Sequence, residues 1–257
     1  MTARSRLPYG VLRFAMACLA ATSALAQPPI KADGRWRATV DVAASYSSGN
    51  SDSGNFSLNA DAVRATTRDR VSAYARSLYG RTEGETTAEL LGGGGRYSFN
   101  LTSRSYVFGQ ADFLRDKPAN IEFRASGAGG LGYKLLDTEA DKFEVFAGLG
   151  YTHDRYFDAT LVAGSVRSRY GYAEALLGEE SNHRLTDSTT FKQKLVFYPN
   201  LGEPGDYRAV FDTGVAVAIN RTLSLTVGFN YRYNTDPGVG VKRGDALFLT
   251  GLAYKLE

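Results

Sequence analysis

The chain has 257 residues, of which 43% are hydrophobic and 22% are charged, with 28 glycines, 16 tyrosines, two histidines and one cysteine. Disordered chains are poor in aromatic residues and highly charged, and disulfide scaffolds need many cysteines, so this composition excludes both classes. A structural zinc site normally takes four cysteine or histidine ligands, which is more than this chain contains. We therefore expect a folded protein without a metal or cofactor.

The N-terminus has the features of an export signal. Arg4 and Arg6 form a short positive region, an apolar stretch covers residues 11–24, and Ala-Leu-Ala at residues 24–26 fits a small-x-small cleavage site. The apolar stretch is shorter than the roughly 20 residues that a membrane-spanning helix needs. We expect residues 1–26 to be a cleaved secretory signal peptide.

Cleavage of this leader changes the charge of the chain. Residues 1–26 contain three arginines and no acidic residue, so the remainder has equal numbers of basic and acidic residues. No clustered basic excess is left to attract nucleic acid. Cys18 leaves with the leader, and a cysteine-free chain suits an oxidising, extracytoplasmic compartment. We expect residues 27–257 to form a single domain.

The remainder of the chain alternates apolar and polar residues with a period of two. In residues 222–233, for example, Leu223 and Leu225 fall on one face, and Ser224 and Thr226 fall on the other. Successive side chains of a strand point to opposite faces, so this pattern predicts a strand with one apolar and one polar side. About twelve segments show the pattern, clearly or weakly: 35–46, 55–64, 71–81, 87–99, 104–113, 121–135, 143–151, 166–177, 190–198, 207–219, 222–233 and 246–256.

Two residues fit the alternation badly. Glu174 falls on the apolar side of segment 166–177, and Gln193 does so in segment 190–198. We expect β-bulges or shifted registers at these two positions, because one extra residue moves every following side chain to the other face.

Alternation alone does not say which face is inside, because a soluble barrel is apolar within and a membrane barrel is the reverse. The polar face here consists mostly of small residues with single charges of both signs, unlike the Lys/Glu-rich surface of a soluble protein. Amphipathic rings settle at the hydrocarbon–headgroup boundary. Tyrosines gather at the ends of the predicted strands: Tyr46, Tyr133, Tyr151, Tyr231, Tyr233 and Tyr254.

The connections between the predicted strands alternate in length. Those expected at the periplasmic end are short: 67–70, 100–103, 137–141, 183–188 and 220–221. Several of those expected at the outer end are longer: 47–53, 82–86, 115–120, 154–165, 200–206 and 234–244. We therefore expect an all-β, transmembrane, up-and-down antiparallel β-barrel with an even number of strands, about 12 (about 10 to 14), in the outer membrane.

A charge that faces mid-bilayer lipid costs about 2–4 kcal/mol for Arg or Lys, so the charged side chains of the polar face are expected to project inward. Barrels of eight strands are filled by side chains, whereas sixteen or more leave a channel. With twelve, the charges either line a weakly selective pore or neutralise one another as a packed plug. The residues expected to line the lumen are Arg37, Asp41, Asp61, Arg76, Arg104, Asp112, Glu122, Arg124, Glu144, Lys192, Lys194, Arg208, Asp212 and Arg232.

Several stretches resemble a known family, the salt-induced outer-membrane proteins, which is catalogued as a domain of unknown function. The resemblance implies an outer-membrane β-barrel without established activity. It covers most of the chain after the leader and is strongest at the C-terminal end. The matching stretches are residues 49–53 (GNSDS), Phe56 and Leu58, Arg115 and Asp116, residues 130–133 (GLGY), 231–237 (YRYNTDP), 242–245 (KRGD) and 250–256 (TGLAYKL).

One departure from the family pattern concerns the last strand. Such barrels usually end in an aromatic residue that the barrel-insertion machinery reads, whereas this chain ends in Leu256 and Glu257. Leu252 and Tyr254 keep the alternate spacing. We therefore expect the insertion machinery to be a partner through a weakened signal, with outer-membrane lipid as the surroundings and an unknown oligomeric state.

Two motifs with possible chemistry have simpler explanations. Residues 127–132 fit G-x-G-x-x-G, but a dinucleotide site needs a strand before and a helix after this motif, and here it lies inside a predicted strand. We expect these glycines to relieve crowding in the barrel wall. The acid-rich stretches 49–55 and 234–236 lack the spacing of a calcium loop, and Asn, Asp and Gly commonly build turns.

The two histidines do not form a shared site. The predicted topology places His153 at the outer rim and His183 at the periplasmic rim, on either side of a hydrocarbon band about 25 Å tall. We expect no enzymatic activity. The function hypotheses are a passive channel, or a structural or stress-responsive envelope barrel that acts through residues 154–165 and 234–244. The alternatives are a lipid-modifying barrel enzyme with His153 as its base and a soluble periplasmic β-sandwich binding protein.

Overall fold

The structure is a computed structural model that describes residues 30–47 and 53–256. The predicted signal peptide and most of the predicted connection 47–53 lie outside the described residues. Within them, no helix is long and apolar enough to cross a membrane. The described regular structure consists of twelve strands: β1 (Trp36–Ser47), β2 (Ser53–Ala65), β3 (Asp69–Thr82), β4 (Glu85–Asn100), β5 (Ser105–Asp116), β6 (Ile121–Asp137), β7 (Asp141–Val162), β8 (Ser165–Arg184), β9 (Thr189–Pro199), β10 (Tyr207–Ala218), β11 (Leu223–Asn234) and β12 (Gly244–Leu256).

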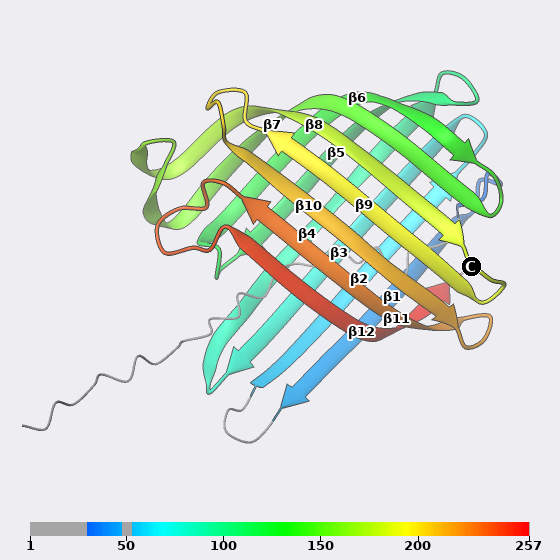
Figure 1. Ribbon diagram of the computed structural model, residues 1–257, viewed down its shortest axis with the longest axis horizontal. Helices are drawn as coiled ribbons and strands as arrows, with labels where there is room; N and C mark the ends of the chain where they lie inside the picture. The colour runs from blue at the N-terminus through cyan, green and yellow to red at the C-terminus, as the bar shows by residue number, and fades with distance from the viewer. Residues whose placement is uncertain (1–29, 48–52, 257) are drawn as a thin grey trace, which may run out of the picture.

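Each strand pairs antiparallel with its neighbours in sequence, and β1 also pairs with β12, so the sheet closes into a barrel (Figure 1). Closure provides partners for backbone N–H and C=O groups that an open sheet would leave at its edges. The prediction of an all-β, up-and-down antiparallel barrel of about twelve strands is confirmed. The alternative of a β-sandwich is wrong, because one continuous sheet forms the whole wall.

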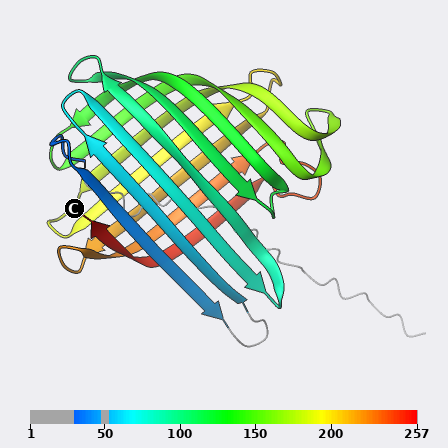
Figure 2. The same ribbon diagram turned by 180° about the vertical axis from the view of Figure 1, so that it is seen from behind.

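The closure between β1 and β12 is short. Five residue pairs join the two strands, the last being Val42 opposite Leu252, whereas β1 pairs with β2 along its whole length. Beyond Val42 the two strands diverge (Figure 2). On the inner side, Leu247 of β12 packs near Leu78 and Leu90 of β3 and β4, so apolar contacts link the two sides of this opening from within.

The two ends of the barrel differ. At the end where β1 begins and β12 ends, all five connections have three or four residues, as between β2 and β3. At the opposite end the described connections range from two residues after β7 to nine after β11. We call these the inner and the outer end. The long hairpin of β7 and β8 projects past the other strands at the outer end (Figure 1).

The predicted outer loop 154–165 is in fact part of this hairpin. β7 continues to Val162 and β8 begins at Ser165, so Ala163 and Gly164 alone form the turn. Both have positive φ angles, 47° and 69°, which suits a two-residue hairpin turn between twisted strands. The loop prediction was wrong because it relied on the polar residues of this stretch, whereas a strand that projects beyond its neighbours needs no apolar face.

Candidate functional site

The barrel wall separates an apolar outside from a polar inside. On β11, Leu225 and Val227 are 43% and 51% exposed on the outer surface, whereas Ser224 and Thr226 are 1% and 0% exposed. The buried polar side chains of the other strands follow the same alternation. The polar face therefore encloses the interior, which we call the lumen.

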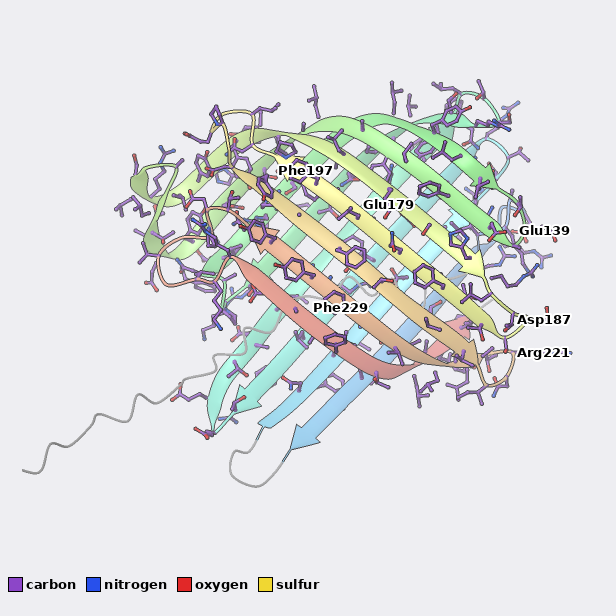
Figure 3. The ribbon with its side chains drawn as sticks, in the orientation of Figure 1. Glu139, Glu179, Asp187, Phe197, Arg221 and Phe229 are labelled. Carbon is purple, nitrogen blue, oxygen red and sulfur yellow. The ribbon has the colours of Figure 1, made fainter. Side chains whose placement is uncertain are left out.

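Figure 3 shows how aromatic and charged side chains divide between the wall and its rim. Phe197 and Phe229 lie on the wall, whereas Glu139, Asp187 and Arg221 lie at the turns of the inner end, and the labelled exception is Glu179, a charged residue on the wall. A bilayer favours this division, since a charge costs free energy at mid-bilayer depth and little near the interface.

The two residues that fit the alternation badly have different explanations. Glu174 lies inside, almost fully buried, where Arg208 contacts it at 2.6 Å. Gln193 on the outside donates a hydrogen bond to Glu179 of the neighbouring strand at 2.9 Å. The register between β8 and β9 is continuous past Gln193, so the bulge predicted there was wrong, and the irregularity of β7 and β8 lies between Arg155 and Thr160.

Glycines inside the wall make room for inward-facing rings. Tyr74 lies opposite Gly94, and Tyr106 lies opposite Gly132. A Cβ atom on Gly132 would overlap the ring of Tyr106. Residues 127–132, which fit the dinucleotide pattern, lie inside β6 with no helix after them. These glycines therefore serve close packing in the wall.

Ion pairs tie the inner surfaces of the strands together. Arg70 of β3 contacts Glu144 of β7 at 2.7 Å, although three strands lie between them along the wall. Arg124 donates hydrogen bonds from both Nε and Nη2 to Asp154, each 2.6 Å long. Two further pairs are Arg76 with Asp61 at 2.7 Å and Lys194 with Glu180 at 3.7 Å.

Most of the residues predicted to line the lumen project into the interior. Eight of them line a cavity there: Asp61, Arg76, Asp112, Arg124, Lys194, Arg208, Asp212 and Arg232. Four more are buried inside the barrel wall: Arg37, Asp41, Glu144 and Lys192.

Two predicted lumen residues lie elsewhere. Arg104 is exposed in the turn before β5, one residue ahead of the strand. Glu122 pairs with Arg155 at 2.8 Å, and both are substantially exposed. A register shift between Ile121 and Phe123 moves Glu122 off the inward face. The placement of Arg104 was wrong because the predicted strand began one residue too early. The placement of Glu122 was wrong because a bulge of one residue moves a side chain to the other face of the sheet.

Several interior residues were not among those predicted to line the lumen. Arg70 precedes the predicted strand 71–81, and Asp154 falls in a predicted loop. Arg96 lies over the rings of Phe108 at 3.8 Å and Phe146 at 4.5 Å. The alternation within β4 could have indicated Arg96, because it continues the inward positions that begin at Leu90, but the glycines between them hide the pattern.

Within the described part of the chain, two larger cavities lie in the lumen. The inner cavity has a volume of about 260 Å³ and extends towards the inner end, where Ile30 and Arg70 line it. The outer cavity has a volume of about 130 Å³ and lies beneath the outer connections, where Asp236 and Lys242 line it. The residues that line both cavities, and so mark their junction, are Leu114, Arg124, Tyr198, Arg208, Val210 and Arg232.

The connection between β11 and β12 docks onto the β7–β8 hairpin at the outer end. The backbone N–H of Ala163 donates to the Asp236 carboxylate at 2.8 Å, and the N–H of Val239 donates to the hydroxyl of Thr160 at 3.1 Å. β7 and β11 are separated by three strands along the wall. The connection therefore reaches over part of the outer mouth of the barrel.

At the inner end, the segment before β1 is anchored to the barrel. Arg37 donates two hydrogen bonds to Asp33, at 2.9 and 2.5 Å, and these hold the pKa of the Asp33 carboxyl well below its usual range. Arg64 of β2 donates to the carbonyl of Gly34 at 2.9 Å. These contacts fix the segment before β1 at the inner end of the barrel, where Ile30 lines the inner cavity.

The histidines lie apart. His153 is exposed on β7, and the ring of His183 makes a 2.8 Å hydrogen bond with Asp141 at the inner end. Among residues 30–47 and 53–256, no three His, Cys, Asp or Glu side chains are grouped so that they could hold a metal ion.

These features define the class of the protein: a closed, twelve-stranded β-barrel of the outer-membrane type, with an apolar wall and a charged lumen. The particular family follows from sequence comparison. The family described as protein of unknown function, DUF481, matches residues 40–256, so the chain belongs to this family. The match confirms the family resemblance seen in the sequence, but its description does not mention salt induction.

The chain is also similar to single proteins. Uncharacterized protein YdiY of Escherichia coli (strain K12) is 29% identical over 153 residues, which is 60% of this chain and 56% of YdiY. The aligned part thus spans little more than half of that relative. Among solved structures, the NanC porin has a TM-score of 0.50 and 11% identity, covering 86% of this chain and 100% of that one. The translocator domain of autotransporter NalP from Neisseria meningitidis has a TM-score of 0.45 and 12% identity, covering 87% and 90%. At this identity the similarity to NanC concerns the fold.

Proposed function

We propose that this protein resides in the outer membrane and that its lumen is a narrow passage for small solutes. The observation that carries the proposal is the junction of the two cavities. Residues from Asp236 near the outer mouth to Ile30 near the inner end line one or the other cavity, and both cavities share the Arg232 side chain. Polar and charged groups line this route, which suits a water-filled path.

The membrane location is supported by the wall itself. An exposed surface of Leu, Val, Phe and Tyr side chains surrounds the barrel, and a large exposed apolar surface marks a lipid or protein contact. Three tyrosines predicted at the strand ends, Tyr133, Tyr231 and Tyr254, are exposed towards the ends of β6, β11 and β12. Tyr151 is also exposed, but its predicted place at a strand end was wrong, because it lies in the middle of β7. Outer-membrane lipid is therefore the proposed partner of the wall. The barrel-insertion machinery is the proposed partner of β12 during assembly.

Single-channel recording in planar bilayers tests the passage. We expect steady, small conductance steps from the folded barrel. Val210→Trp places a large ring at the junction of the cavities and should abolish the steps. Val217→Trp is the matched control, because Val217 lies on the same strand but is exposed on the outside. Both variants are first checked for the mobility shift on heating that a closed barrel shows in detergent electrophoresis.

A non-conducting envelope barrel is the second candidate, and the Arg70–Glu144 contact across the lumen favours it. Silence from folded wild-type protein would support this candidate and contradict the passage. Unchanged conductance in folded Val210→Trp would also contradict a route through the junction of the cavities.

A further inference from the structure

We propose that the junction of the two cavities is a binding site for a small organic anion that carries a carboxylate or phosphate group. The inference rests on the proposed function, since the ligand would reach the site through the lumen. Its basis is a group of arginine donors that make no hydrogen bond to any residue in 30–47 or 53–256.

Arg232 is the centre of the site. It lines both cavities, and its Nε is buried without a hydrogen-bond partner. Within the described part of the chain it makes no hydrogen bond and no ion pair, although Asp245 lies opposite it on β12. Buried polar groups are normally satisfied, and each exception calls for an explanation. A guanidinium in a cavity with free donors is suited to receive an oxyanion.

Two more arginines add donors to the same junction. Arg124 uses Nε and Nη2 for Asp154, and Arg208 uses Nη2 for Glu174 and Thr152. In both, Nη1 makes no hydrogen bond to any described residue, and Nε of Arg208 is also buried without a partner. β6, which carries Arg124, lies nearly opposite β11 in the ring of strands. The donors therefore approach the junction from two sides.

The carboxylates of the lumen do not occupy these donors. Asp112 accepts hydrogen bonds from the Tyr74 hydroxyl at 2.6 Å and the Gln110 amide at 3.2 Å. Asp212 accepts a hydrogen bond from Asn230. The lining of the inner cavity thus includes a carboxylate, Asp112, that accepts hydrogen bonds from neutral donors, and an arginine, Arg232, that has no acceptor among the described residues.

Two other acidic residues lie near Arg232. Asp116 and Asp245 line the outer cavity but not the inner one, so their negative charge acts on the outer side of Arg232. Because Arg124, Arg208 and Arg232 line both cavities, a ligand in the inner cavity reaches them without passing Asp116 or Asp245. The same two carboxylates should weaken anion binding. Removal of one of them should therefore strengthen binding, whereas removal of Arg232 should weaken it.

The size and shape of the site limit the ligand. Guanidinium groups match carboxylate and phosphate oxygens in a planar, two-bond geometry. The inner cavity of about 260 Å³ is slightly smaller than typical small-molecule pockets, which have roughly 300–1,000 Å³. Arg208 lies over the ring of Tyr198 at 5.1 Å, which adds a flat wall. The ligand class is therefore a compact organic anion.

Titration calorimetry of the purified barrel in detergent tests the site without requiring conductance. The probe is succinate, and its neutral analogue succinamide is the control ligand. We expect saturable binding of succinate and none of succinamide. Arg232→Gln should weaken succinate binding by about tenfold or more, because hydrogen bonds to charged groups are strong. Arg104→Gln, in an exposed turn, is the matched control and should leave the affinity unchanged.

Asp245→Asn supplies an independent variant should Arg232→Gln fail to fold. Removal of this carboxylate should tighten succinate binding by a few fold, because it removes repulsion at the junction. Equal binding of succinate and succinamide, no binding to the wild type, unchanged affinity in folded Arg232→Gln, or unchanged affinity in Asp245→Asn would each overturn the anion site. Binding by a barrel that is silent in bilayers would uphold the site and refute the passage.

Discussion

Arg70 and Glu144 meet at 2.7 Å across the lumen, from β3 and β7. Between these strands, β4 and β6 present glycines to the interior, including Gly94 and Gly132. The ring of Tyr106 fills the space over Gly132, and the guanidinium of Arg70 lies over the same ring at 5.9 Å. The ion pair is therefore flanked by a ring that a glycine accommodates.

Loss of this pair should destabilise the barrel. Arg70→Gln leaves Glu144 without its charged partner, and hydrogen bonds to charged groups contribute about 1.5–3 kcal/mol. We expect the free energy of unfolding in urea, measured in lipid vesicles, to fall by about that amount. Lys142→Gln removes an exposed pair with Asp137 and should change stability by about 0–1 kcal/mol. Equal effects of the two variants would contradict a structural role for the lumen bridge.

Gly132 should not tolerate a side chain while Tyr106 is present. Gly132→Val forces a methyl-bearing Cβ into the Tyr106 ring, and overpacking of this kind costs about 1–3 kcal/mol. The double variant Gly132→Val with Tyr106→Ala should recover much of the loss, as measured by thermal unfolding in detergent. Gly109→Val is the control, since Gly109 is exposed and a Cβ atom there would meet open space. Additive losses in the double variant would argue against the predicted overlap.

Asp236 should hold the β11–β12 connection over the outer mouth. Asp236→Ala removes the acceptor for the Ala163 N–H and leaves one docking hydrogen bond, from Val239 to Thr160. We expect faster cleavage of the connection between β11 and β12 by added protease. Asp187→Ala, in an exposed turn at the inner end, should leave the rate unchanged. An unchanged cleavage rate in Asp236→Ala would show that this contact does not restrain the connection.

The short closure between β1 and β12 should make Leu252 sensitive to loss of its backbone donor. Leu252→Pro removes an N–H group and distorts one of the five pairs that close the barrel. We expect the heat-dependent mobility shift in electrophoresis to disappear. Leu252→Ala keeps the backbone and should retain the shift. A shift that survives in Leu252→Pro would mean that closure does not rely on this register.

Period-two alternation is enough to predict the class of fold. Each of the twelve predicted segments overlaps one observed strand, because a wall between an apolar and a polar environment imposes the same pattern on every strand. The length of β7 and β8 could not be predicted in this way. Their outer parts contain polar residues on both faces, such as Thr152 inside and His153 outside.

The lumen is less accessible to sequence reasoning. Charged residues at alternate positions of regular strands, such as Asp212 and Arg232, indicate the inward face directly. The ion-pair partner of a residue cannot be predicted from the sequence of its own strand, since Glu144 meets Arg70 only because the barrel closes. A bulge also hides orientation, as for Glu122, because the register shift is not visible in the residue types.

Spin labels on β11 in bilayers test the central claim that the apolar face meets lipid and the polar face encloses the lumen. Cysteines are placed singly at Leu225 and Val227 on one face and at Asn230 and Arg232 on the other, in a background with Cys18 removed along with the leader. We predict that labels at 225 and 227 collide mainly with oxygen dissolved in lipid, and that labels at 230 and 232 do not. Reversed accessibility, or the same accessibility at all four positions, would contradict the account.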